Sequence, residues 1–230
     1  MPSVPLDHDL YLVATPIGNL QDMSPRAVEV LQGVDLIAAE DTRHTRKLCA
    51  HWNISTDIQS FHEHNERDKA PGLVAAMKCG RRVALVCDAG TPSISDPGFP
   101  LVRLAIKESL KVAAVPGPSS LLAALVVSGL PTDRFHFEGF LSNKGATRRR
   151  RLKELSEYSH TLVFFESPHR IVKALIDAAE ILGDRPASLS RELTKKFEET
   201  LHGTLPELLD HVQTKAPKGE LVLVISGAKK

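Results

Sequence analysis

Short apolar runs alternate with polar or Gly/Pro-rich loops through the first half of the chain. Four runs lie at 10–14, 35–39, 58–61 and 111–115, and a fifth leads into the loop at 88–98. Each run has the length of a β-strand, and each following loop opens a helical pattern of apolar residues. This rhythm predicts a parallel β/α sheet whose loops meet at one edge, where such sheets bind ligands.

The loop at 88–98 carries the richest polar chemistry of these loops. Gly90 and Gly98 allow a bound molecule to approach the backbone, and two prolines stiffen the path. Hydroxyl and carboxylate side chains supply polar contacts, namely Asp88, Thr91, Ser93, Ser95 and Asp96. The loop is therefore interpreted as a ligand-binding loop, with a long surface turn as the alternative.

The second half of the chain has a different pattern. Apolar runs at 134–141, 161–166, 187–191, 197–203 and 220–226 predict strands, and only the short polar link 192–196 joins the third to the fourth. A short link favours an antiparallel hairpin, so this half is expected to hold a mixed sheet. The fold class is therefore α/β, with an N-terminal parallel β/α domain over 1–130 and a C-terminal mixed α/β domain over 131–230.

Composition narrows the class of protein. The chain has 230 residues, 42% of them hydrophobic, which is enough to bury a large core. It has no run of about 18 apolar residues that could span a membrane, and its first ten residues do not have the pattern of a signal peptide. We therefore expect a cytoplasmic protein with no membrane partner. The three cysteines lack Cys-x-x-Cys spacing, which predicts reduced, buried thiols. A net charge of +1 means that any contact with nucleic acid must come from a local basic patch.

One such patch is present, and it holds Lys144, Arg148, Arg149, Arg150 and Arg151. Four consecutive arginines cannot share one face of a helix, so some of them must project into solvent or onto a partner. Guanidinium groups bind phosphate in a bidentate manner, which makes an RNA backbone the functional interpretation. A solvated helix end is the alternative.

Several familiar chemistries lack their motifs. The chain has no Gly-x-Gly-x-x-Gly after the first strand and no Gly-x-x-x-x-Gly-Lys-Ser/Thr, so neither a Rossmann site nor an NTPase is indicated. His62 and His64 have no third ligand nearby in the sequence, and we expect no metal. Glu40 and Asp41 stand beside Arg43 and His44, which favours a network of ion pairs.

Seven segments in order resemble the tetrapyrrole methylase superfamily. They are 12–20 (LVATPIGNL), 39–43 (AEDTR), 88–98 (DAGTPSISDPG), 115–120 (VPGPSS), 137–140 (FEGF), 165–170 (FESPHR) and 191–195 (RELTK). Within the superfamily they resemble the branch that 2′-O-methylates a cytidine in the decoding region of small-subunit (16S) ribosomal RNA. The resemblance extends from about residue 10 to residue 227 and implies the fold of that superfamily, with two domains.

The resemblance also implies a cofactor, S-adenosylmethionine, held in a cleft between the domains of a homodimer. Positions that match cofactor-binding segments are Pro16, Thr91, Ile94, Ser119, Ser120, Phe165 and Glu192. Methyl transfer to a ribose hydroxyl needs a proton acceptor, and the candidate catalytic residues are Asp88 and Glu192. For both carboxylates a hydrogen-bonded role in the loop is the alternative.

Other functions stay open on the sequence alone. The same fold methylates small tetrapyrroles and a protein side chain, and a non-catalytic RNA- or nucleotide-binding module would also account for the arginines. The arginine run favours small-subunit ribosomal RNA or a ribosomal particle as the partner. Family members usually continue into a small helical C-terminal domain, whereas this sequence ends at Lys230, as a truncated or a naturally shorter member would.

Overall fold

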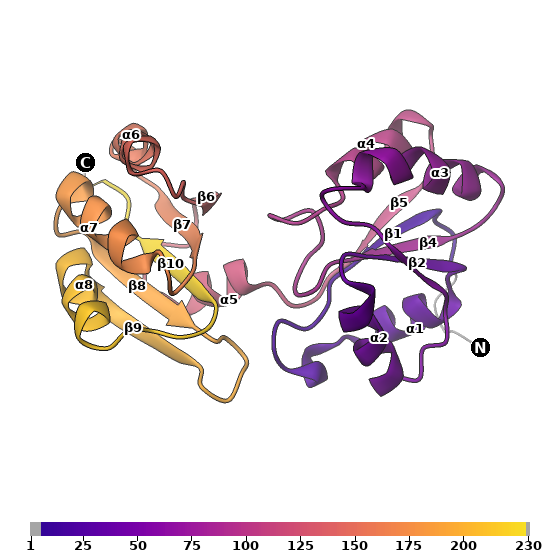
Figure 1. The fold of residues 1–230 in the computed structure, drawn as a ribbon, viewed down its shortest axis with the longest axis horizontal. Coiled ribbons are helices and arrows are strands. Elements are labelled where there is room, and N and C mark those ends of the chain that lie inside the picture. Colours follow the sequence, from indigo (N-terminus) through magenta and orange to yellow (C-terminus); the bar gives the residue numbers. More distant parts are fainter. Residues whose placement is uncertain (1–5, 229–230) are drawn as a thin grey trace. The chain divides into compact units, whose positions relative to one another are not determined.

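A computed structural model describes residues 6–228, which form two compact units (Figure 1). We call the described residues up to Ser119 unit 1 and those from Ser120 onward unit 2. The units divide before the boundary predicted at 130/131 because helix α5 (Ser120–Val127) packs against strands of unit 2.

Unit 1 holds a parallel sheet. Its strands run in the order β3-β2-β4-β1-β5 and every pair is parallel, as the sequence predicts. The elements are β1 (Leu10–Val13), the 3-10 helix η1 (Leu20–Asp22), α1 (Pro25–Gly33), β2 (Leu36–Ala39), α2 (Thr42–His51), β3 (Ile58–Ser60), α3 (Glu66–Lys78), β4 (Val83–Val86), α4 (Phe99–Lys107) and β5 (Val112–Val115).

Helices cover both faces of this sheet (Figure 1). On β4, Ala84 and Val86 join the core under α1 and α2, while Val83 and Leu85 join the core under α3 and α4. Alternate residues of a strand point to opposite faces, so a central strand must be apolar throughout. All four residues of β4 are buried.

Unit 2 holds a mixed sheet with the order β6-β7-β10-β8-β9. The β6–β7 pair is parallel and the other pairs are antiparallel, including the predicted hairpin of β8 and β9. After α5, the elements are β6 (Phe135–Phe140), α6 (Gly145–Leu155), β7 (Thr161–Glu166), α7 (Ile171–Leu182), β8 (Pro186–Arg191), β9 (Glu199–Thr204), α8 (Leu205–Thr214) and β10 (Leu221–Ile225).

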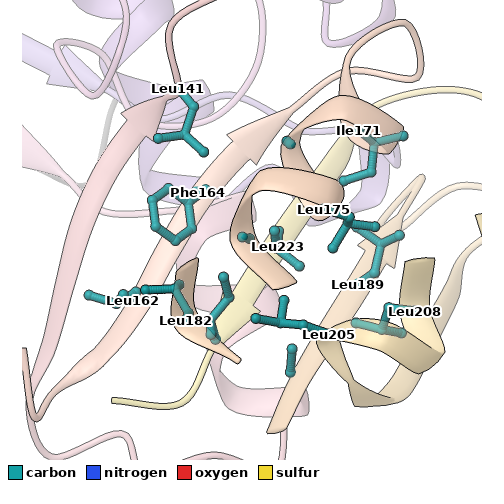
Figure 2. Close-up of a cluster of buried hydrophobic side chains, with 14 of the residues drawn as sticks. Leu141, Leu162, Phe164, Ile171, Leu175, Leu182, Leu189, Leu205, Leu208 and Leu223 are labelled. Atoms are coloured by element: carbon teal, nitrogen blue, oxygen red, sulfur yellow. The ribbon is translucent and has the colours of Figure 1, made fainter. Parts of the chain in front are cut away.

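The core of unit 2 joins one face of this sheet to α6, α7 and α8. Figure 2 shows Leu175 of α7 and Leu208 of α8 packed over Leu189 and Leu223 of the strands. Burial of each such side chain contributes about 1.5–3 kcal/mol. The two-domain α/β fold class predicted from the sequence is therefore confirmed.

The outermost strand β6 is irregular. Its register with β7 shifts between Phe137 and Gly139, which marks a bulge at Glu138, and Gly139 has a φ of 72°. Glycine adopts this left-handed conformation without the steric cost that a side chain would bring.

Across residues 6–228 we find no helix with both the length and the apolar character that crossing a bilayer requires.

Candidate functional site

Four loops of unit 1 are joined at the carboxyl ends of its strands. Thr15 and Gly90 exchange two backbone hydrogen bonds of 2.9 and 3.0 Å, and Thr91 Oγ1 donates to the carbonyl of Pro118 at 3.3 Å. Asp88 Oδ1 accepts from the amide of Asp41 at 3.0 Å. We call segments 15–19, 39–43, 88–98 and 116–119 the unit 1 loop cluster, and it joins four of the five loops that the sequence predicts to converge.

Two glycines make this convergence possible. A Cβ on Gly117 would lie 3.1 Å from Ala14 Cβ, so any other residue would require the two segments to move slightly apart. Gly98 has a φ of 141°, and a Cβ there would lie 2.7 Å from Leu85 Cδ2 and would also meet Ser93 Oγ. The loop at 88–98 therefore folds back onto the core only because residue 98 has no side chain.

The cofactor-binding candidates of unit 1 all lie in this cluster. Pro16 is buried, Thr91 and Ser119 are half-buried, and Ile94 is 40% exposed. The structure brings Pro16 and Thr91 together because each follows a residue of the Thr15–Gly90 bridge. The cluster thus offers an apolar contact at Ile94 beside half-buried hydroxyls.

Carboxylates give the cluster an acidic character. Burial raises the pKa of Glu40, and burial together with the charges of Glu40 and Asp88 raises the pKa of Asp96 to about 6. Burial also raises the pKa of the Cys87 thiol. Cys49 and Cys87 are buried, as the sequence predicts, whereas Cys79 is exposed, contrary to that prediction. Sequence reasoning noted Asp96 only as a polar contact, because a local motif does not reveal burial.

Asp41 belongs to a local network. It caps α2 by accepting from the amide of Arg43 at 2.8 Å, and its Oδ2 pairs with Arg43 Nη2 at 2.7 Å. Hydrogen bonds from Arg43 hold the pKa of Asp41 well below its usual range. The predicted ion pairing in this loop is confirmed for Asp41 and Arg43.

Asp88 lies two residues beyond the end of β4, after the buried Cys87. Its amide donates to Glu40 Oε2 at 3.3 Å, and its Oδ1 accepts from Asp41. Oδ2 has no hydrogen-bond partner among residues 6–228. The carboxylate is therefore fixed in position by one oxygen and can accept a proton on the other.

The remaining candidates lie in unit 2. Ser120 begins α5, and Phe165 and Glu192 stand at the ends of β7 and β8. The register pairs Leu221 of β10 with both Glu166 and Arg191, so these two strand ends lie at the same edge of the sheet.

Glu192 is already engaged within this edge. Its Oε1 pairs with Lys195 Nζ at 3.0 Å and accepts from the amide of Glu220 at 3.1 Å, and Lys195 lowers its pKa. It also borders a cavity of about 490 Å³ inside unit 2, which Arg191, Phe197 and Lys215 line as well. A carboxylate held in this way is a weak proton acceptor, because its ionised form is stabilised.

The arginine run differs from the expectation that it faces RNA. Arg148 is buried, and its Nε donates to Asp177 Oδ2 at 2.7 Å. Arg149 Nη1 pairs with Asp177 Oδ1 at 2.9 Å and its other nitrogen pairs with Glu180. Arg151 Nε pairs with Glu138 at 2.7 Å. All four guanidinium groups therefore pair with carboxylates of unit 2, with Arg150 the most distant, at 3.9 Å from Glu154 Oε1.

Two members of the predicted RNA-binding set do face solvent. Arg150 has a side chain 76% exposed, and Lys144 is exposed at the start of α6. Successive residues of a helix differ in direction by about 100°, which is why Arg148 and Arg150 point to opposite environments. Among residues 6–228 no group of three or more His, Cys, Asp or Glu side chains is arranged to hold a metal ion.

Comparison with known proteins gives a consistent result. A family model described as "Tetrapyrrole (Corrin/Porphyrin) Methylases" matches residues 9–209. The chain is 50% identical over 220 residues to "Ribosomal RNA small subunit methyltransferase I" of Synechocystis, a match that covers 95% of this chain and 79% of the relative.

Solved structures share the fold at low sequence identity. The methyltransferase CobJ superposes with a TM-score of 0.71 at 16% identity, covering 96% of this chain and 95% of the other. Uroporphyrin-III C-methyl transferase from Thermus thermophilus, solved in complex with S-adenyl homocysteine, gives a TM-score of 0.64 at 19% identity, covering 94% and 96%. These likenesses concern the arrangement of helices and strands.

Proposed function

We propose a function from the premise that this chain belongs to the tetrapyrrole (corrin/porphyrin) methylase family. The protein is a methyltransferase that uses S-adenosylmethionine to methylate the 2′-hydroxyl of a cytidine in small-subunit (16S) ribosomal RNA. The 50% identity to a small-subunit ribosomal RNA methyltransferase over 95% of the chain carries this proposal.

The unit 1 loop cluster suits this cofactor. S-adenosylmethionine brings a methyl group on a positively charged sulfur, together with an ammonium group, and Glu40, Asp88 and Asp96 make the cluster acidic. Ile94 and Pro16 offer apolar contacts to an adenine ring, and Thr91 and Ser119 offer hydroxyls. We propose these four residues of unit 1, and Ser120, Phe165 and Glu192 of unit 2, as the cofactor-binding set.

Asp88 is our proposed proton acceptor. A ribose hydroxyl attacks a methyl carbon in line with its bond to sulfur, and loses its proton as the new O–C bond forms. Asp88 Oδ2 can take that proton while Oδ1 remains bound to the amide of Asp41. We assign Glu192 a place in the wall of the site, because Lys195 and the amide of Glu220 hold its carboxylate.

Methyl transfer to unmethylated small-subunit particles tests the function. Purified protein with labelled S-adenosylmethionine should place label on a single cytidine, and the ribose 2′-O-methyl should protect the next phosphodiester from alkaline hydrolysis. A 2′-deoxycytidine at that position should accept no label. Transfer to a uroporphyrin-type tetrapyrrole, and none to RNA, would instead support the small-molecule alternative.

Asp88→Asn tests the assigned proton acceptor. The asparagine side-chain oxygen can still accept from the amide of Asp41, but the amide group cannot take a proton. We expect kcat to fall by about 100-fold or more, and S-adenosylmethionine affinity by calorimetry to fall much less, because Glu40 and Asp96 keep the cluster acidic. An unchanged kcat would exclude Asp88 from this role.

We further propose that the protein is a homodimer. Helix α5 exposes Leu122, Val126 and Val127 at 51%, 70% and 45%, which is a large apolar surface for so short a helix. Light scattering should give twice the chain mass of 25.1 kDa at micromolar concentration. A mass equal to one chain would refute the dimer.

A further inference from the structure

An exposed aromatic ring stands beside a guanidinium group in unit 2. Phe140, the last residue of β6, is 53% exposed, and Arg170 Cζ lies 5.2 Å from the centre of its ring. Phe165 supports the ring from within unit 2, with ring centres 5.6 Å apart and planes at 60°. Exposure of so large an apolar ring has no packing benefit for the unit itself.

The guanidinium of Arg170 is held in place. Its Nη1 donates to Asn143 Oδ1 at 3.0 Å, and its Nε lies 3.5 Å from Oε2 of Glu166, whose side chain is 1% exposed. One ion pair with a buried carboxylate and one hydrogen bond hold the guanidinium beside Phe140. We call Phe140 and Arg170 the Phe–Arg platform.

Unpaired cations lie near the platform in sequence. Lys144 begins α6 just beyond Asn143, and Lys173 lies one turn along α7 from Arg170. Both lysines are exposed, and neither forms an ion pair within the described part of the chain. Lys144 and Arg170 occupy the starts of helices, where the helix dipole disfavours a cation, so their charges do not serve helix stability.

We propose that an unpaired nucleobase of the RNA substrate stacks on the Phe–Arg platform, with its phosphate beside Lys144. Aromatic rings and guanidinium planes are the side chains on which single-stranded bases stack, and lysines neutralise the adjoining backbone. The inference rests on the proposed function, since it takes RNA as the substrate. It assigns RNA binding to the β6–α6 and β7–α7 loops in place of Arg148, Arg149 and Arg151.

Phe140→Leu tests the platform, and Phe135→Leu is the matched control. Phe135 begins the same strand and is 40% exposed, and no ring or cation contact involves it among the described residues. The probe is a short single-stranded RNA of the small-subunit sequence that carries 2-aminopurine in place of one of its bases. Wild type should quench its fluorescence by stacking, whereas Phe140→Leu should abolish the quenching and weaken binding about tenfold. Phe135→Leu should match wild type.

Three further measurements complete the test. Arg170→Lys keeps the charge opposite Glu166 but loses the planar group, so it should also reduce quenching. A fully paired duplex of the same sequence should bind wild type and Phe140→Leu equally, because its bases are not available for stacking. Thermal unfolding should show that Phe140→Leu keeps the stability of wild type, since the ring is largely exposed.

The outcomes separate this inference from the proposed function. Equal quenching and affinity for wild type and Phe140→Leu, with methyl transfer intact, would overturn the platform and leave the function standing. Weaker binding to the ribosomal particle without any change on naked RNA would indicate a protein contact and would also overturn it. Absence of both RNA binding and methyl transfer in wild type would overturn both proposals.

Discussion

The two units place functional groups at strand ends in different ways. In unit 1, four loops bond to one another, and the site is half-buried and acidic, with Asp96 at a pKa of about 6. In unit 2, the ends of β6 and β7 present an exposed ring and cations such as Lys144. An acidic, enclosed cluster suits a small cation, whereas an open basic surface suits a polyanion.

Strand direction accounts for this difference. Every strand of unit 1 is parallel, so all its strand ends supply loops to one edge. In unit 2 only the β6–β7 pair is parallel, so the loops at that edge are fewer and less enclosed. If this comparison is correct, changes that disturb one unit should leave the other intact.

The largest effect is expected from Gly98→Ala in unit 1. Alanine rarely adopts the φ of 141° found at this position, and its Cβ would meet Leu85 Cδ2 at 2.7 Å. We expect the two effects together to lower the free energy of unfolding by about 4 kcal/mol. Hydrogen exchange resolved by segment should show lost protection in unit 1 and unchanged protection in unit 2. S-adenosylmethionine binding should weaken in parallel.

Gly72→Ala is the control for this change. It lies in α3, where a Cβ would meet nothing within 4 Å, and alanine favours a helix over glycine by about 1 kcal/mol. Unit 1 should therefore gain stability. A loss at Gly72→Ala similar to that at Gly98→Ala would mean that unit 1 does not tolerate any added methyl group, and the argument from Gly98 would fail.

Arg148→Ala should be the counterpart in unit 2. It leaves Asp177 buried with only Arg149 to balance its charge, so we expect a cost of about 3 kcal/mol in unfolding by denaturant. Arg150→Ala, two residues along the same helix and exposed, should change stability by less than about 0.5 kcal/mol. Comparable losses for the two variants would contradict the structural role assigned to Arg148.

Asp96→Asn should give the smallest effect and the sharpest pH signature. The raised pKa means that the folded protein holds a proton that the unfolded chain releases, so stability falls as the pH rises from about 4 to about 6. Asparagine carries no charge at pH 7.5, so the variant should be more stable than wild type by about 1 kcal/mol at that pH, a modest gain because solvent screens a partly exposed carboxylate. Below pH 4 the two proteins should be equally stable. Thermal unfolding of wild type and variant between pH 4 and pH 7.5 measures this difference, and equal curves across that range would contradict it.

The fold could be predicted in large part because its signals are local. Apolar runs of strand length, each followed by a loop and a helical pattern, identify the parallel sheet, and the short link between β8 and β9 identifies the hairpin. The unit boundary could not be placed in this way. Whether α5 belongs to one unit or the other depends on its packing against β7 and β10, which lie far along the chain.

The parts of the candidate site that are formed by a local backbone motif could be predicted from the sequence. Features that depend on residues far away in the sequence could not. Glycines and prolines marked the loop at 88–98, but the burial that perturbs Asp96 comes from the folded loops around it. Arg148 looked like a surface cation because its partner Asp177 lies 29 residues away on another helix. Phe140 gave no sign of exposure, since an aromatic residue in a strand is usually packed.

The bulge at Glu138 bears on how readily the edge of this sheet can pair with the edge of another copy of the protein. β6 is an edge strand that ends in an exposed phenylalanine, a combination that invites pairing with the edge of another molecule. The shifted register interrupts the row of amides and carbonyls that such pairing needs, two residues before Phe140. The protein can therefore expose the Phe140 ring at the end of β6 without offering a regular strand edge on which a fibril could grow.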